Sequence, residues 1–126
     1  MTGATGRYPR THRLRAATQY QKVFRQCKCK ASDRYMSVLA IPNLLGYARL
    51  GTTVSIRNAG GAAPRNRIKR LIRESFRQHQ DMLVGWDLVV LVRPGIAARS
   101  NAQVFDALQN HWRTIASHAH TGPDTD

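Results

Sequence analysis

Residues 65–77, with the sequence RNRIKRLIRESFR, constrain this chain more than any other part of it. They hold six of its 20 Lys and Arg residues and a single acid. On a helix of about 100° per residue, apolar side chains and cations separate onto opposite faces. The inward face is expected to hold Ile68, Leu71, Ile72, Ser75 and Phe76, and the outward face Asn66, Lys69, Arg70, Arg73 and Arg77. The fold must therefore bury one face of this helix and leave the other open.

A basic run of this kind is often no more than a solvated helix face. Here an anion-binding face is favoured, because the six cations repel one another at i,i+3 and i,i+4 with only Glu74 to offset them. Five of the six are Arg, whose planar guanidinium pairs with phosphate in a bidentate way. Asn66 adds a hydrogen-bonding group between Arg65 and Arg67. Pro64 is expected at the first helical position, where free backbone amides favour an anion.

The charge of the whole chain supports the same interpretation. Its 126 residues fit a single domain over residues 1–126, with a formal net charge of +13 and a sequence pI of about 11.3. Such an excess is typical of proteins whose partner supplies negative charge, with nucleic acid ahead of an anionic membrane. The sequence has no run of about 18 apolar residues and no apolar signal segment. We therefore expect a cytoplasmic protein with no membrane partner and no obligate protein partner.

The first half of the chain predicts a basic arm, a helix and two strands. Residues 1–13 lack periodicity and are expected to be flexible. Thr18 and Gln21 have the spacing of a capping box, so a helix should begin near Thr18. Residues 34–41 are rich in β-formers, residues 42–47 make a connection of hairpin length, and residues 49–57 alternate like a half-buried strand.

The second half predicts a turn, the basic helix, a buried strand and a last helix. Residues 58–63, NAGGAA, should be flexible and turn sharply at the two glycines. Residues 86–92 form a continuous apolar run, which indicates a strand buried on both faces. Ser100 and Gln103 form a capping box that opens the last helix, and the tail from Ala116 is expected to be disordered. This order of elements predicts an α+β sandwich of helices against a small sheet.

Residues that could carry chemistry are scattered along the chain. A protein-only nuclease typically groups carboxylates around Mg²⁺ ions. The seven acids of this chain show no such cluster in the sequence. No Ser or Cys has an evident base beside it. Cys27 and Cys29 are poorly placed to bridge each other or to complete a zinc site, so free thiols are expected. The chain should therefore bind its partner without catalytic or metal-ligating residues of its own.

The sequence RNRIKRLIRESFR resembles the motif of the protein subunit family of bacterial ribonuclease P, an RNR triplet that opens a basic amphipathic helix. Flanking pieces fit in order: TQYQKVF at residues 18–24, RLGTTVS at 49–55 and WDLVVLVRP at 86–94. The resemblance covers about residues 11–117, the expected ordered core. It implies a two-layer α+β sandwich of the ribosomal protein S5 domain 2-like kind. It also implies a left-handed βαβ crossover, a rare exception to the usual hand.

The resemblance also implies a function and a set of binding residues. The family's protein subunit binds a catalytic RNA and the 5′ leader of precursor tRNA, while that RNA and its Mg²⁺ ions remove the leader by phosphodiester hydrolysis. By the RNR motif, contacts to the catalytic RNA are expected from Arg65, Asn66, Arg67 and Arg70. A cleft for the leader is expected from Lys69 and Arg73 together with Tyr20 and Phe24. Two lysines usually follow the strand in this family, and of their counterparts Ile56 and Arg57 only Arg57 can bind RNA.

Other interpretations remain open at this point. The spacing of Tyr20 and Phe24 fits ordinary core packing as well as a stacking surface for bases. A ribosomal protein or an RNA chaperone would use the same basic helix, although it would need neither the RNR triplet nor an aromatic cleft. A helix-turn-helix DNA-binding protein would need a short helix just before the basic one, where the sequence predicts a polar strand and a Gly-rich loop.

Overall fold

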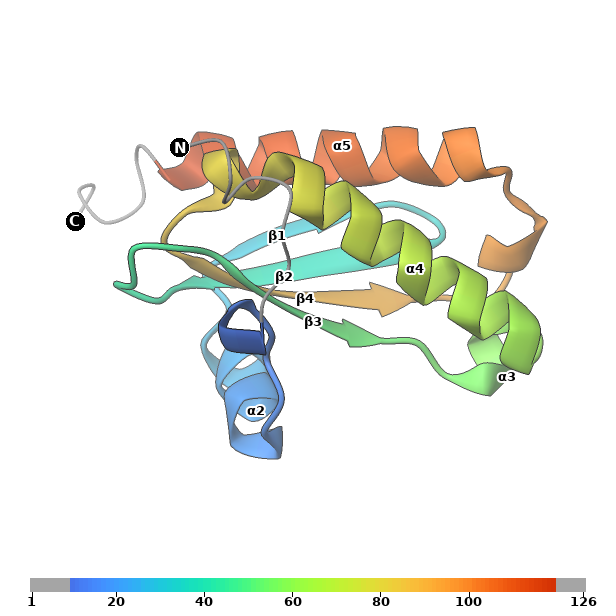
Figure 1. Cartoon of the computed structure of the whole chain (residues 1–126), viewed down its shortest axis with the longest axis horizontal. Coiled ribbons are helices and arrows are strands. Elements are labelled where there is room, and N and C mark those ends of the chain that lie inside the picture. The colour runs from blue at the N-terminus through green and yellow to red at the C-terminus, as the bar shows by residue number, and fades with distance from the viewer. Residues whose placement is uncertain (1–9, 120–126) are drawn as a thin grey trace.

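A four-stranded mixed sheet forms the centre of the protein in the computed structural model, which describes residues 10–119 (Figure 1). Its strands are β1 (Cys29–Ser32), β2 (Met36–Pro42), β3 (Arg49–Thr53) and β4 (Trp86–Val92). They lie in the order β1-β2-β4-β3; β3 runs parallel to β4, and the other strand pairs are antiparallel. The predicted α+β class is confirmed.

Helices cover both faces of this sheet. Helices α4 (Ala62–His79) and α5 (Asn101–Ala119) pack on one face, and α2 (Ala17–Gln26) packs on the other (Figure 1). The larger core lies under α4 and α5, and a smaller one lies under α2. The shorter elements are η1 (Arg10–His12), α3 (Ile56–Ala59), η2 (Gln80–Leu83) and η3 (Ile96–Ala98). The sandwich therefore has three layers where two were predicted.

Strand β4 occupies the middle of the sheet and corrects the predicted hairpin. Its residues are buried with one exception, which confirms the strand predicted from the apolar run. It pairs with β2 on one side and with β3 on the other, so β2 and β3 are not neighbours although a short loop joins them. Parallel strands need a long crossover, here supplied by α3 and α4. Loop length alone could not reveal this insertion.

The segments around β3 and β1 also depart from the prediction. Strand β1 has no counterpart among the predicted elements. Strand β3 ends at Thr53, and the Ser55 hydroxyl caps the short helix α3 by accepting from the Asn58 N–H at 3.0 Å. Gly60 and Gly61 then turn the chain sharply, with φ of 88° and 137°, as the glycine pair predicted. Helix α4 begins at Ala62 rather than at Pro64.

Capping explains where two of the helices begin. Ser100 Oγ accepts the Gln103 N–H at 3.1 Å and Gln103 Oε1 accepts the Ser100 N–H at 2.9 Å, which confirms the capping box of α5. Helix α2 instead begins at Ala17, because Gln19 Oε1 accepts the N–H groups of the two residues that precede the helix. The capping box predicted from Thr18 and Gln21 is therefore wrong.

The predicted arm and tail are only partly described. Residues 10–12 form η1, and Arg13 makes a bridge with Leu50 at the edge of the sheet. Helix α5 continues to Ala119, past the predicted start of the tail at Ala116. Residues 1–9 and 120–126 lie outside the described part of the chain. Cys27 and Cys29 are free thiols, as predicted.

Helix α2 approaches the sheet closely at Gly51 of β3. A Cβ atom at this position would lie 2.6–2.7 Å from atoms of the Tyr20 side chain. The Thr52 N–H donates to the Tyr20 hydroxyl at 3.2 Å, which fixes the ring over this glycine. A side chain at residue 51 would therefore displace Tyr20.

We predict that Gly51→Ala lowers the free energy of unfolding by about 1–3 kcal/mol, because the added methyl group overpacks this contact. Gly46→Ala is the matched control, since a Cβ at Gly46 would meet nothing within 4 Å. The control should be neutral or stabilising by about 0.4–1 kcal/mol. Denaturant titration of both variants measures the difference, and equal midpoints would contradict the close approach of Tyr20.

Candidate nucleic-acid interface

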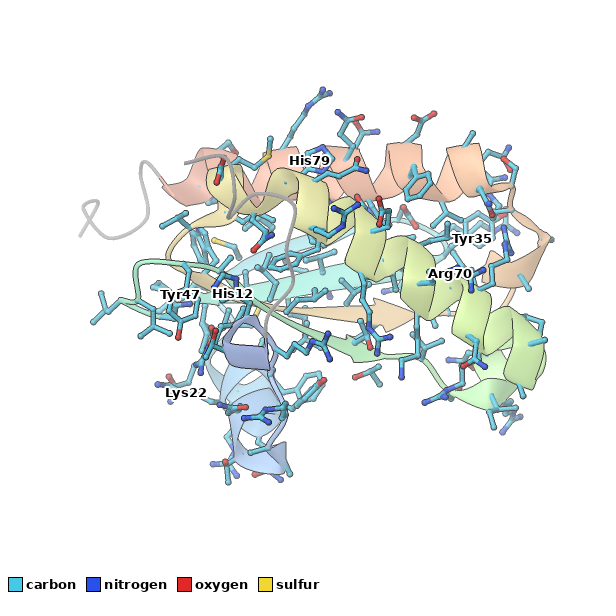
Figure 2. The ribbon with its side chains drawn as sticks, in the orientation of Figure 1. His12, Lys22, Tyr35, Tyr47, Arg70 and His79 are labelled. Atoms are coloured by element: carbon cyan, nitrogen blue, oxygen red, sulfur yellow. The ribbon has the colours of Figure 1, made fainter. Side chains whose placement is uncertain are left out.

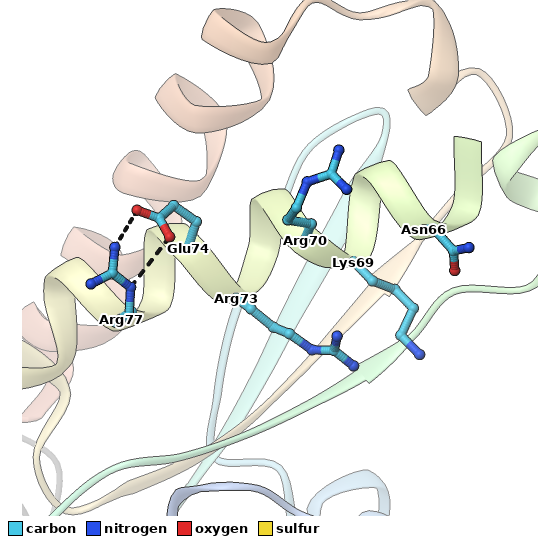
Figure 3. Close-up of a pocket in the computed structure, with 6 residues that line it drawn as sticks. All are labelled: Asn66, Lys69, Arg70, Arg73, Glu74 and Arg77. Carbon is cyan, nitrogen blue, oxygen red and sulfur yellow. Dashed lines mark hydrogen bonds and ion pairs between the residues drawn. The ribbon is translucent and has the colours of Figure 1, made fainter. Parts of the chain in front are cut away.

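The two faces of α4 are arranged as its sequence predicted. The buried side chains are Ile68, Leu71, Ile72, Ser75 and Phe76. Ser75 is satisfied within the core because its hydroxyl accepts a hydrogen bond from Trp112 Nε1 at 2.8 Å, and the Trp112 ring packs edge-on against Phe76. On the opposite side, a hollow of about 450 Å³ is lined by Asn66, Lys69, Arg70, Arg73, Glu74 and Arg77 (Figure 3). Burial of one face thus presents the other to solvent.

The single acid of α4 neutralises the C-terminal end of this row. Glu74 accepts hydrogen bonds from both Nε and Nη2 of Arg77 and from Gln78 Nε2 (Figure 3). The hydrogen bonds from Arg77 lower the pKa of Glu74. The positive charge of the face is therefore concentrated at Lys69, Arg70 and Arg73.

Lys69 and Arg73 form a pair distinct from Arg70. Figure 3 shows their side chains pointing to the side of α4 where β3 lies, while Arg70 points to the other side. Burial lowers the pKa of Lys69, and the charges of Arg65 and Arg73 lower it further. A bound polyanion would offset this repulsion, which is the electrostatic condition expected of a phosphate-binding face.

Arg65 and Arg67 have intramolecular contacts that the sequence did not predict. Arg65 Nε donates to the carbonyl of Val54 at 2.6 Å and so ties the start of α4 to the end of β3. The Arg67 guanidinium donates to the Asn101 side chain at 2.8 Å and to the carbonyls of Ala97 at 3.3 Å and Arg99 at 2.6 Å. These acceptors, 30–34 residues further along the chain, leave no local signal in the sequence.

The guanidinium of Arg67 keeps donors for a second role. It has five N–H groups, of which the contacts to Ala97, Arg99 and Asn101 use one on each nitrogen. Arg67 therefore holds the junction of η3 and α5 and has two further N–H groups that these contacts do not use.

Arg57 lies on α3, just before the glycine turn into α4. Its side chain is exposed, as is that of Ile56, which is 57% exposed. Asn58 Nδ2 donates to the carbonyl of Val92 at 3.0 Å and fixes α3 to the end of β4. Arg57 thus occupies a fixed position near the start of the basic helix, with the exposed apolar side chain of Ile56 beside it in the sequence.

Tyr20 and Phe24 differ in burial although both lie on α2. Tyr20 is partly buried against β3 and joins the smaller core, whereas Phe24 is 43% exposed. Val23 between them on the helix is fully buried. The core interpretation therefore suits Tyr20 in part and does not suit Phe24. The exposed ring is available for stacking.

Two acids outside α4 are engaged by partners within the protein. Asp33 is hydrogen-bonded to His111 at 2.8 Å, and Asp87 forms an ion pair with Arg49 at 2.7 Å. Within the described residues, no three His, Cys, Asp or Glu side chains come together as ligands for a metal ion. No helix between residues 10 and 119 combines the length and apolar content needed to span a membrane.

Comparisons with known proteins point to a single family. The model of the family described as Ribonuclease P matches residues 8–116. The ribonuclease P protein component of Chromohalobacter salexigens is 43% identical over 108 residues, which cover 86% of this chain and 84% of the relative. That of Pseudomonas aeruginosa is 37% identical over 108 residues, with coverage of 86% and 80%.

Solved structures of the same family share the fold. The RNase P protein from Thermotoga maritima is 32% identical, with a TM-score of 0.69 and coverage of 78% of this chain and 92% of that one. The RNase P protein of Staphylococcus aureus is 26% identical, with a TM-score of 0.74 and coverage of 81% and 93%. The four-stranded mixed sheet with its helices is therefore the arrangement of these proteins.

We predict that Arg67→Ala and Arg70→Ala have different effects, because Arg67 stabilises the fold whereas Arg70 is expected to bind RNA. Arg67→Ala should lower the free energy of unfolding by about 1–3 kcal/mol, because it removes three hydrogen bonds to η3 and α5. Arg70→Ala should change it by less than about 0.5 kcal/mol, since Arg70 is exposed. It should instead flatten the log–log salt dependence of RNA affinity by about 0.7–0.9.

Denaturant titration and RNA binding at several salt concentrations measure both quantities. Equal stability of the two variants would contradict the intramolecular role of Arg67. An unchanged salt slope in Arg70→Ala would remove Arg70 from the interface.

Proposed function

The chain belongs to the family of bacterial ribonuclease P protein components, subunits of an endoribonuclease that acts in tRNA processing, and from this membership we propose how its surfaces are used. We propose that the protein binds the catalytic RNA subunit and the 5′ leader of precursor tRNA. In this way it assists the Mg²⁺-dependent removal of the leader that produces the mature 5′ end. The observation that carries the proposal is the outward row of α4, where Lys69, Arg70 and Arg73 lie together and form no ion pair with an acid among residues 10–119.

Contacts to the catalytic RNA are assigned to the N-terminal part of α4 and to α3. Arg70 and Asn66 are exposed, and the guanidinium groups of Arg65 and Arg67 keep N–H donors beyond those used within the protein. Arg57 extends this surface across the glycine turn. Arginine suits the task because its planar donors fit phosphate oxygens in pairs.

Contacts to the leader are assigned to Lys69, Arg73, Tyr20 and Phe24. The two cations point toward the side of α4 where β3 lies, and α2 carries the two aromatic residues on the opposite face of the same sheet (Figures 1 and 3). An unpaired strand that passes the edge of β3 would meet phosphate-binding groups first and the exposed ring of Phe24 next. Stacking on such a ring is tolerant of sequence, as a leader of variable sequence requires.

The chemistry of hydrolysis is assigned to the RNA subunit. A protein site for Mg²⁺ usually supplies one or two converging carboxylates beside waters and phosphates, whereas Asp33, Glu74 and Asp87 lie on separate segments and are engaged by His111, Arg77 and Arg49. These residues do not fit a magnesium site, so the ion is expected to be held mainly by RNA. The role of the protein is then to neutralise phosphates and to position the substrate.

Further assignments follow from family membership. We infer that residues 1–126 act as one domain in the cytoplasm, without an obligate protein partner. The crossover from β3 through α4 to β4 is inferred to be left-handed, in a ribosomal protein S5 domain 2-like arrangement.

A helix-turn-helix function is not supported, because α3 makes a single turn and the apolar face of α4 is buried in the larger core.

We predict that the purified protein alone does not cleave precursor tRNA, since the acids in the described part of the chain do not converge on a metal site. The assay follows release of the 5′ leader in Mg²⁺ with and without the RNA subunit. Cleavage should appear only when both subunits are present. Specific cleavage by protein freed of RNA would overturn the division of roles.

We also predict that Phe24→Ala weakens binding of leader-bearing precursor tRNA by about 1–3 kcal/mol, the contribution of one base stacked on an aromatic ring. Binding of mature tRNA should not change. The melting temperature should fall little, because the ring is 43% exposed.

Val23→Ala is the matched control on the same helix. Val23 is fully buried, so its truncation should cost about 2 kcal/mol of stability. It should leave the difference between the two tRNAs unchanged. If Phe24→Ala behaved like Val23→Ala, Phe24 would be a core residue and the cleft would lose one aromatic wall.

A further inference from the structure

A second basic hollow lies at the N-terminal end of α2, away from the outward row of α4. It encloses about 500 Å³ and is lined by Thr11, Arg13, Arg15, Ala16, Gln19, Tyr47 and Arg49. Three of these residues are arginines, and none is an acid. The hollow is open to solvent at Arg13 and Arg15, whose side chains are exposed.

The acid that pairs with Arg49 accepts three hydrogen bonds. Asp87 is buried beneath Arg49 and accepts hydrogen bonds from its Nε at 2.8 Å and its Nη2 at 2.7 Å. Asn43 Nδ2 donates to the same carboxylate at 2.8 Å. The hydrogen bonds that Arg49 donates to Asp87 raise the pKa of Arg49. Asp87 therefore neutralises Arg49, whereas Arg15 forms no ion pair with another residue of the described part of the chain.

The hollow also has an aromatic wall. The Tyr47 ring stacks on the His12 ring with centroids 4.4 Å apart and planes 11° from parallel. His12 Nδ1 is in turn 2.9 Å from Gln80 Oε1, so the pair is held from behind. Tyr47 is partly buried, and it lines the hollow beside the arginines. A flat ring next to guanidinium groups fits an unpaired nucleotide, with the base on the ring and the phosphate on the cations.

The position of the hollow relates it to the basic helix. The Leu14 N–H donates to the Leu50 carbonyl at 2.9 Å, which fixes the flanking Arg13 and Arg15 along the edge strand β3. The contact between His12 and Gln80 joins the hollow to the C-terminal end of α4. Figure 2 shows His12 and Tyr47 at one end of the sheet and Arg70 toward the other end of α4. One RNA could thus engage both places.

We propose that this hollow is a second RNA-binding surface, which takes an unpaired segment with phosphates at Arg13 and Arg15 and a base on Tyr47. The proposal rests on the proposed function, in that the chain is taken to bind RNA, and it adds a site at the other end of the sheet. The unpaired segment comes either from the catalytic RNA or from the leader of precursor tRNA. The two sources share the chemistry that the hollow recognises, and the experiment distinguishes them.

The test uses the full chain with three labelled probes: the catalytic RNA, precursor tRNA with its leader, and mature tRNA. Tyr47→Leu should weaken binding of the RNA that supplies the segment by about 5- to 150-fold, as expected for loss of one stacked base. Tyr47→Phe keeps the ring and should bind as the parent does. Arg15→Ala should flatten the salt slope by about 0.7, the value for one phosphate of a single strand.

Two controls make the outcome specific. Arg113→Ala removes one exposed cation from α5, on the opposite face of the sheet, and should leave the slope unchanged. Arg70→Ala reports on the proposed function itself. Melting curves check folding, and Arg15→Ala still tests the hollow if Tyr47→Leu is unstable, because only the backbone N–H of Arg15 is bonded to Gln19.

Losses confined to the catalytic RNA, or to precursor over mature tRNA, support the proposal and identify the source. Unchanged binding by Tyr47→Leu and Arg15→Ala, with a flatter slope in Arg70→Ala, overturns the second surface and leaves the proposed function intact. Losses in Arg113→Ala equal to those in Arg15→Ala also overturn it, because net charge alone then explains the effect. If Arg70→Ala is unchanged as well, both proposals fail together.

Discussion

Burial of the apolar face of α4 is the interaction on which the rest of the structure depends. Along the helix, cations face each other at i,i+3 and i,i+4, and each such pair costs about 0.2–0.5 kcal/mol. Each large apolar side chain removed from water on the other face contributes roughly 1.5–3 kcal/mol. Burial of Ile68, Ile72 and Phe76 therefore outweighs the repulsion and keeps the cations together. The folded protein thus presents concentrated positive charge, which a bound polyanion would stabilise further.

The parts of the fold that could be predicted are those whose residues carry the signal locally. The period of the apolar residues defined the inward face of α4, and the unbroken apolar run defined β4. Strand β1 was not predicted, because its four residues, two of them buried, give too short a pattern of alternation. The order of the strands could not be predicted, because β4 lies between β2 and β3 in the sheet but follows both of them and α4 in the chain. Such pairing is decided by tertiary packing, which a loop of hairpin length does not reveal.

The candidate site shows the same division between local and distant information. Helical spacing placed Lys69 and Arg73 on one side of α4, and the structure agrees. Helical spacing could not show that Arg67 donates to the carbonyls of Ala97 and Arg99. Every residue has a backbone carbonyl, so the residue type does not reveal which one accepts a distant hydrogen bond. Nor could it separate Tyr20 from Phe24, since their difference in exposure comes from the close approach of α2 at Gly51.

Strand β3 links the two basic surfaces, because groups at this edge of the sheet hold residues of both. An edge strand leaves N–H and C=O groups without a neighbouring strand, which exposes a protein to unwanted pairing. Here the Leu50 carbonyl accepts the Leu14 N–H at 2.9 Å, and the carbonyl of Val54, just beyond the strand, accepts Arg65 Nε at 2.6 Å. The same contacts that occupy this edge fix Arg13 and Arg15 at one end of β3 and the start of α4 at the other. Cations from segments far apart in the sequence are thereby held along one strand, so the sheet itself sets the spacing at which phosphates can be bound.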